Sequence, residues 1–199
     1  MNHAVTLPLT RRSFIATAGL GLAAAGIAGA AEPAASASDL PDPELLSDGE
    51  TRTYLLVFRT GQEVMKGLTA FARKHKLEAG TLTGIGALNG AALGFFDPEK
   101  KAYVRERQSA QFELLSLNGN LALRDGEPFF HVHVTLGRLD GPAWGGHLFE
   151  ASVLPTVEIV LTTYPTPMRR KTDAAWGIPL LDPSAGDGKL PRRIESKRP

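Results

Sequence analysis

Residues 52–76 read RTYLLVFRT-G-QEVMKGLTAFARKHK, and the change of pattern within this stretch decides the fold class. Its first part, to about residue 60, is rich in aromatic and branched apolar residues, which predicts a strand that ends at Gly61. From Gln62 to about Lys76 the apolar residues recur at helical spacing. This spacing predicts an amphipathic helix whose apolar face consists of Val64, Leu68, Phe71 and Ala72.

Downstream of Gly80 the sequence predicts short strands and no second long helix. Turn signals such as Asn89-Gly90, Asn118-Gly119 and Asp140-Gly141 separate them. The predicted strands are Thr81–Ala87, Ala91–Asp97, Ala102–Gln108, Phe112–Asn118, Asn120–Arg124, Phe129–Leu139, a short one near Gly145–Phe149, and Val157–Thr163. One helix among many strands predicts a single α+β domain, in which a curved, mostly antiparallel sheet carries one main packed helix.

Three histidines form the strongest candidate for a functional site. His131 and His133 alternate with apolar residues, so in a strand both imidazoles point to one face and the apolar side chains to the other. The turn signal Asp140-Gly141-Pro142 allows the chain to return and to bring His147 beside the pair. Because three neutral imidazoles with an open fourth position make a zinc-type site, we expect a divalent metal here, with zinc the expected ion. The alternative is that His131 and His133 are ordinary strand residues with backbone partners.

Glu158 is a tentative candidate for a catalytic role. It alternates with Val157 and Ile159, so it faces away from that apolar pair. A three-histidine zinc ion acts as a Lewis acid, and the site needs further groups that orient the imidazoles or move a proton. Glu158 could do either if its strand neighbours the histidine strand, and otherwise it is a solvent-facing strand residue.

The N-terminus predicts export. Arg11-Arg12 precede Phe14-Ile15 and an apolar run of Ala, Gly and Leu, which is the pattern of a twin-arginine signal. Ala35-Ser36-Ala37 offers a cleavage site, and Ala28-Gly29-Ala30 is a second option. We therefore expect residues 1–37 to be a twin-arginine signal peptide and the protein to be periplasmic or secreted. The run is too rich in Gly and Ala for a stable membrane span, so none is expected after cleavage. An uncleaved anchor or a chance basic start are the alternatives.

The segments on either side of the predicted domain differ from it in composition. Residues 38–51 are rich in Pro, Asp and Ser and predict a disordered linker. Residues 165–199 form a Pro-rich, basic C-terminal extension, in which Arg169-Arg170-Lys171 is expected to be solvated. The apolar residues of this extension, from Trp176 to Leu181, are expected to dock on the domain or on a neighbouring subunit.

Charge and cysteine content exclude some classes of function. Without the signal, 162 residues remain, enough for one domain with a core, and they hold 20 basic and 20 acidic residues. An even balance gives no long-range attraction for nucleic acid. There is no cysteine, so any metal site must use histidine and carboxylate ligands.

Four stretches in a fixed order resemble one family. They are Thr83-Gly84-Ile85-Gly86-Ala87-Leu88, the FELLSLNG stretch at 112–119, the His-x-His strand, and Gly145-Gly146-His147-Leu148. Together with the preceding strand and helix, residues 52–164 resemble the plants-and-prokaryotes conserved domain, abbreviated PPC. The resemblance implies an α+β fold assembled as a homotrimer. In bacterial and archaeal members with these histidines it also implies a metal site, here on His131, His133 and His147.

The resemblance leaves several classes of function open. The first is an exported, trimeric, metal-binding module for a small molecule or a protein, whose identity is unknown. The second is a metal-dependent hydrolase or lyase with the same site, so enzymatic activity is undecided. DNA binding is less favoured, because the plant members carry AT-hooks and this chain has no Arg-Gly-Arg-Pro core. A cupin site is disfavoured because residues 134–139 contain no Glu after the second histidine.

Overall fold

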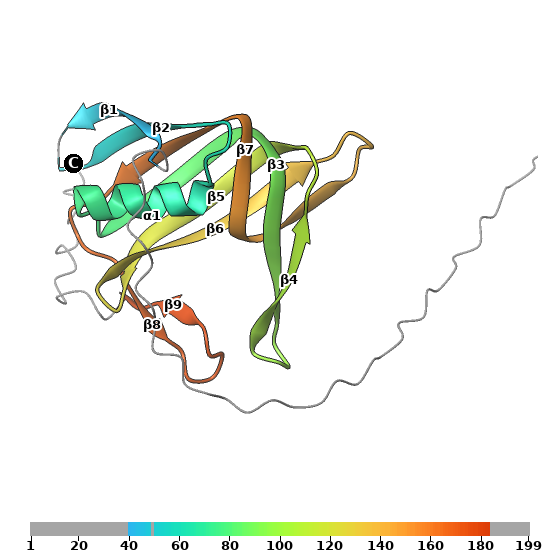
Figure 1. The fold of residues 1–199 in the computed structure, drawn as a ribbon. Helices are drawn as coiled ribbons and strands as arrows, with labels where there is room; N and C mark the ends of the chain where they lie inside the picture. The colour runs from blue at the N-terminus through green and yellow to red at the C-terminus, as the bar shows by residue number, and fades with distance from the viewer. Residues whose placement is uncertain (1–39, 49, 184–199) are drawn as a thin grey trace, which may run out of the picture. The chain divides into compact units, whose positions relative to one another are not determined.

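The computed structural model describes residues 40–48 and 50–183. In these residues nine strands pair into one sheet, and a single helix, α1 (Val64–His75), packs against it (Figure 1). The strands are β1 (Asp42–Asp48), β2 (Arg52–Arg59), β3 (Ala79–Asp97), β4 (Ala102–Gln108), β5 (Phe112–Arg124), β6 (Glu127–Gly137), β7 (Ala143–Thr163), β8 (Arg169–Thr172) and β9 (Pro179–Leu181). All pairings between them are antiparallel except that of β5 with β8. The predicted class, a mostly antiparallel sheet with one helix, is confirmed. Within the described part of the chain, no helix has the length and apolar character needed to cross a membrane.

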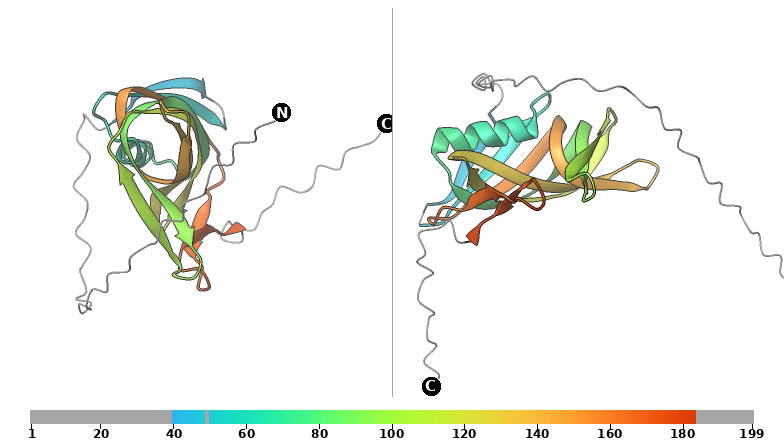
Figure 2. Two further views of the ribbon diagram at one scale, coloured as in Figure 1. Left: turned by 90° about the vertical axis from the view of Figure 1, so that its right-hand side faces the viewer. Right: turned by 90° about the horizontal axis from the view of Figure 1, so that it is seen from below.

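The sheet curls until four of its strands close into a ring. β3 pairs with both β5 and β7, and β6 also pairs with both of them. Figure 2 shows this ring end-on. The inner face of the ring holds the apolar core, to which β6 contributes Phe130, Val132, Val134 and Leu136. Alternate residues of the same strand therefore lie on the outer face.

Helix α1 completes the core on the side of β6 and β7. Its four predicted apolar residues are all buried, which confirms the helical pattern. The carboxylate of Glu63 accepts hydrogen bonds from the backbone N–H groups of Met65 and Lys66, and so caps the first turn. The same carboxylate accepts a hydrogen bond from the backbone N–H of Ala151 in β7, at 2.8 Å. One side chain thus starts the helix and fixes it to the sheet.

Two of the predicted turns are wrong. β3 continues through Asn89-Gly90 and β5 continues through Asn118-Gly119, in both cases without a reversal. Gly119 instead allows β5 and β6 to approach closely, because a Cβ at this position would lie 2.5 Å from the carbonyl oxygen of His131. The two segments predicted at 145–149 and 157–163 likewise join in the single long strand β7.

The segments outside the predicted domain also differ from expectation. β1 lies within the predicted disordered linker and pairs with β2, so that prediction is wrong for residues 42–48. The C-terminal extension contributes β8, which pairs with β5, and β9, which pairs with β8. The predicted signal peptide, residues 1–37, and residues 184–199 lie outside the described part of the chain.

Candidate metal centre

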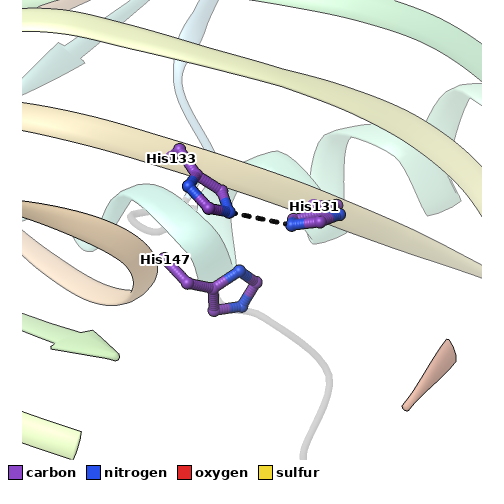
Figure 3. Close-up of side chains that lie close together, drawn as sticks. All are labelled: His131, His133 and His147. Carbon is purple, nitrogen blue, oxygen red and sulfur yellow. Dashed lines mark hydrogen bonds between the residues drawn. The ribbon is translucent and has the colours of Figure 1, made fainter. Parts of the chain in front are cut away.

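The three predicted histidines meet across the hairpin formed by β6 and β7. The chain turns between Arg138 and Pro142, as the Asp-Gly signal predicted, and His147 lies directly opposite His133 in the register of the two strands. His131 and His133 share the outer face of β6, because the residues between and beside them point into the core. Figure 3 shows the pair on one strand and His147 reaching them from the next.

The ring nitrogens lie at distances that one metal ion could bridge. Nε2 of His131 is 3.0 Å from Nε2 of His133, and one ligand atom from each of the three residues lies within 4.8 Å of the other two. A zinc–nitrogen bond of about 2 Å places the nitrogens of a tetrahedral site about 3.3 Å apart. The three side chains therefore need only small rotations to coordinate one ion.

His147 is the most enclosed of the three histidines. It is 8% exposed, whereas His133 is exposed and His131 half-buried. The ring of Tyr103, from β4, lies 4.7 Å from the His147 ring, and the ring of Phe149, from β7, lies 4.8 Å from it. These aromatic side chains cover one side of the centre, while His133 leaves the other side open to solvent.

The surroundings keep two of the imidazoles uncharged. Burial, with the positive charge of Arg170 and the neighbouring His133, lowers the pKa of His131 from 6.5 to about 4. Burial, with the other two histidines, Arg105 and Arg170, lowers the pKa of His147 from 6.5 to about 4. Both rings are thus neutral at pH 7, which is the form in which histidine binds a metal ion.

One unsatisfied atom supports the fit of a metal ion to these residues. Nδ1 of His147 is buried and has no hydrogen-bond partner among the described residues. Buried polar atoms of this kind are uncommon and often mark the place of an ion or a water molecule. The donor set itself, three imidazole nitrogens, suits zinc and the neighbouring transition metals.

Glu158 does not join the histidines within one chain. It is exposed on β7, where its strand partners are Val57 of β2 and Ile85 of β3. The condition for its predicted role, that its strand segment lies beside the histidine strand, is therefore not met within the chain. β7 is long enough to pair with β6 at one end and to carry Glu158 near the other.

Sequence patterns missed the residues that surround the three ligands. Arg170 was expected to be solvated with its basic neighbours, yet it is 7% exposed, so that prediction is wrong for this residue. Tyr103, Arg105 and Phe149 follow ordinary strand alternation, and no local signal distinguishes them. The role of Tyr103 and Arg105 depends on how the β3–β4 hairpin folds over the outer face, which alternation alone does not reveal.

Comparison with known proteins finds one matching family and several similar structures. The Plants and Prokaryotes Conserved (PCC) domain family, whose abbreviation is also written PPC, matches residues 46–165. A PPC protein from Pyrococcus horikoshii is 37% identical, with a TM-score of 0.63 over 71% of this chain and 94% of its own. A metal-containing protein from Archaeoglobus fulgidus is 32% identical, with a TM-score of 0.62 over 72% of this chain and 98% of its own.

Other similar proteins carry different descriptions. A protein from Bacteroides thetaiotaomicron, provisionally described as DNA-binding, is 29% identical, with a TM-score of 0.66 over 70% of this chain and 96% of its own. The bifunctional protein GlmU of Synechococcus sp. is 35% identical over 131 residues, or 65% of this chain. This chain therefore spans only 20% of the length of that GlmU.

Proposed function

Because the chain belongs to the Plants and Prokaryotes Conserved domain family, we propose that it is a metal-binding member with a divalent ion on His131, His133 and His147. The observation that carries this proposal is the convergence of three imidazoles from two strands within 4.8 Å. The similarity to a protein described as metal-containing adds support.

Zinc is the ion we propose. It accepts three histidine ligands in a tetrahedral site that keeps one position for an outside ligand, and it does not require a thiolate, which this cysteine-free chain cannot supply. When bound there, it would act as a Lewis acid towards an oxygen ligand. His131 and His147 would hold it as neutral donors, and Tyr103 and Phe149 would limit the approach of water from one side.

Two uses of such a centre remain distinct proposals. The first is a binding module that presents the metal to a small molecule or a protein. The second is a hydrolase or lyase, and the exposure of His133 supports it because a substrate can reach the ion from solvent. We place the module first, since Glu158 lies away from the histidines and the three-histidine group itself includes no carboxylate that could act as a base.

Export and assembly are further proposals. The paired arginines at 11 and 12 support passage through the twin-arginine route to the periplasm or beyond. The family supports a homotrimer, and several large apolar side chains on the sheet are exposed in one chain, among them Ile85, Phe95 and Leu115. Light scattering that gives the mass of a single chain would contradict the trimer.

The direct test of the proposed function is metal analysis of protein purified without an affinity tag. We expect about one divalent ion per chain, with zinc the predominant element. Protein loaded to less than a tenth of one equivalent after exposure to zinc and gel filtration would contradict the proposal.

The lowered pKa values predict how the centre responds to acid. Because His131 and His147 have pKa values of about 4, they stay neutral when the pH falls to 6, whereas unfolded-chain imidazoles have a pKa near 6.5. Stability of the metal-free protein is therefore retained above pH 6.5 and is lost progressively as the pH falls from 6.5 towards 4. Protons compete with the metal at these two ligands only as the pH approaches 4, so we expect the Kd for zinc to rise below that pH, and zinc titrations at each pH measure this. An unchanged Kd between pH 5 and pH 3.5 would contradict the assignment of these two ligands.

A further inference from the structure

Arg170 reaches the metal centre from β8, outside the residues that match the family. Its guanidinium donates one hydrogen bond to Oδ1 of Asn120, at 2.6 Å, and another to the carbonyl oxygen of Pro179, at 2.9 Å. Asn120 is the strand partner of His131, and the guanidinium also lies 5.4 Å from the centre of the Phe129 ring. Asn120 lies opposite His131, and Phe129 precedes His131 by two residues in β6, so the two contacts hold the positive charge where it acts on that histidine.

Among the described residues, no acidic side chain pairs with the buried charge of Arg170. None of the ion pairs between described residues includes Arg170, and both of its acceptors are neutral oxygens. In the part of the chain that the structure describes, its Nε–H is also buried with no acceptor. Burying a guanidinium in this way is costly unless an anion balances it.

The rest of the centre adds positive charge. The three-histidine group contains no carboxylate, so a divalent ion held by neutral imidazoles would keep its full charge. The guanidinium of Arg105 lies 3.7 Å from the centre of the Phe149 ring, and that ring contacts His147. Two arginines and a divalent ion therefore lie close together, and the fourth ligand of the ion is expected to be an anion.

The C-terminal segment that carries Arg170 contacts the β3–β4 hairpin. Between β8 and β9, the ring of Trp176 lies 6.2 Å from that of Phe96, in the β3–β4 hairpin that carries Tyr103. Figures 1 and 2 show β8 and β9 beside the tip of this hairpin. Two segments thus border the histidines. The β3–β4 hairpin supplies Tyr103 and Arg105, and the C-terminal segment supplies Arg170.

We propose that Arg170 forms an oxyanion-binding subsite of the metal centre, which holds the carboxylate or phosphate group of a small ligand bound at the ion. This inference rests on the proposed metal site and names the class of ligand that the site takes. The planar fork of a guanidinium matches both oxyanions, and its N–H groups not used by Asn120 and Pro179 remain as donors.

The test uses the full chain loaded with Co²⁺, whose visible absorption reports the coordination of the ion. Acetate, inorganic phosphate and imidazole are titrated separately, with imidazole as a neutral metal ligand. We expect acetate or phosphate to change the spectrum with saturation, and the stronger of the two identifies the preferred oxyanion.

Variants of Arg170 separate its charge from its structural contacts. In Arg170→Met we expect the Kd for the preferred oxyanion to rise at least tenfold, because a charge-assisted hydrogen bond is lost. Cobalt content and the Kd for imidazole should change less than threefold. Arg170→Lys keeps the charge without the fork and should give an intermediate Kd, and it serves if the Met variant does not fold. The matched control is Arg124→Met, since Arg124 also lies over the Phe129 ring, at 5.7 Å, but is exposed.

The outcomes distinguish failure of the oxyanion subsite from failure of the metal site. Loss of affinity for the oxyanion and for imidazole together, in both Arg170 variants, would show a purely structural role and overturn the proposal. An unchanged Kd in Arg170→Met, or no response of the natural chain to either oxyanion, would also overturn it while leaving the metal site intact. Absence of the cobalt spectrum in the natural chain would instead refute the metal site and, with it, the subsite.

Discussion

Replacement of His147 by Ala is expected to abolish metal binding, with the metal content falling from about one equivalent to below a tenth. The variant loses the most enclosed of the three ligands, and the two imidazoles left on β6 cannot by themselves fill three positions around the ion. His131→Ala should behave in the same way. Metal analysis after gel filtration, and calorimetric titration with Zn²⁺, measure the loss.

The chain provides its own control for this experiment. His75 is exposed in the last turn of α1, where it packs against the Phe71 ring, and it does not belong to the three-histidine group. His75→Ala should therefore keep the full metal content. Near-normal metal in His147→Ala, or equal loss in His75→Ala, would remove the centre from this part of the sheet.

Gly119→Ala is expected to destabilise the sheet next to the histidines. The added Cβ would lie 2.5 Å from the carbonyl oxygen of His131 and 3.1 Å from Cα of Val132, so the backbone of β6 has to move. Such overpacking costs about 1–3 kcal/mol. Because the displaced residues lie in the strand that carries two of the ligands, zinc affinity should fall together with the denaturation midpoint.

Gly90→Ala is the matched comparison for this glycine. Gly90 also lies within a long strand, but the nearest atom to an added Cβ would be the carbonyl oxygen of Gln108 at 3.5 Å, an ordinary contact. Thermal and chemical denaturation of both variants, with zinc titrations, test the contrast. Equal stability of Gly119→Ala and Gly90→Ala would show that the close approach of β5 and β6 does not constrain the fold.

Local periodicity was sufficient to predict the helix and the histidine strand. The apolar residues recur at regular helical spacing in α1 and at every second position in β6. The Asp-Gly signal at 140–141 correctly indicated the return of the chain to His147. The Asn-Gly signals at 89–90 and 118–119 look the same in sequence but lie inside strands. Gly119 allows β5 and β6 to approach closely, and the pairing of β3 with β7 shifts in register between Leu88 and Gly90, so both positions depend on neighbours that are remote in sequence.

The surroundings of the histidines were not predictable in this way. Arg170 lies among basic residues that resemble a solvated tail, and only its pairing through β8 with β5 places it beside Asn120. For Glu158 the predicted face of the strand is correct, because it points away from Val157 and Ile159. However, its position along β7 separates it from the histidines. Alternation determines which face a side chain takes, but it does not determine which residues become neighbours on that face.

His131 and His133 lie on the outer face of β6, so the two side chains are separate from the apolar core on the opposite face of the strand. Phe130, Val132 and Val134 anchor the strand from the opposite side, so the interior does not depend on which groups project outward between them. The residues at positions 131 and 133, and the proposed metal ion with them, can therefore change without repacking the core beneath β6. A domain built in this way is suited to diversification, since new specificities can arise on its surface while its architecture is inherited unchanged.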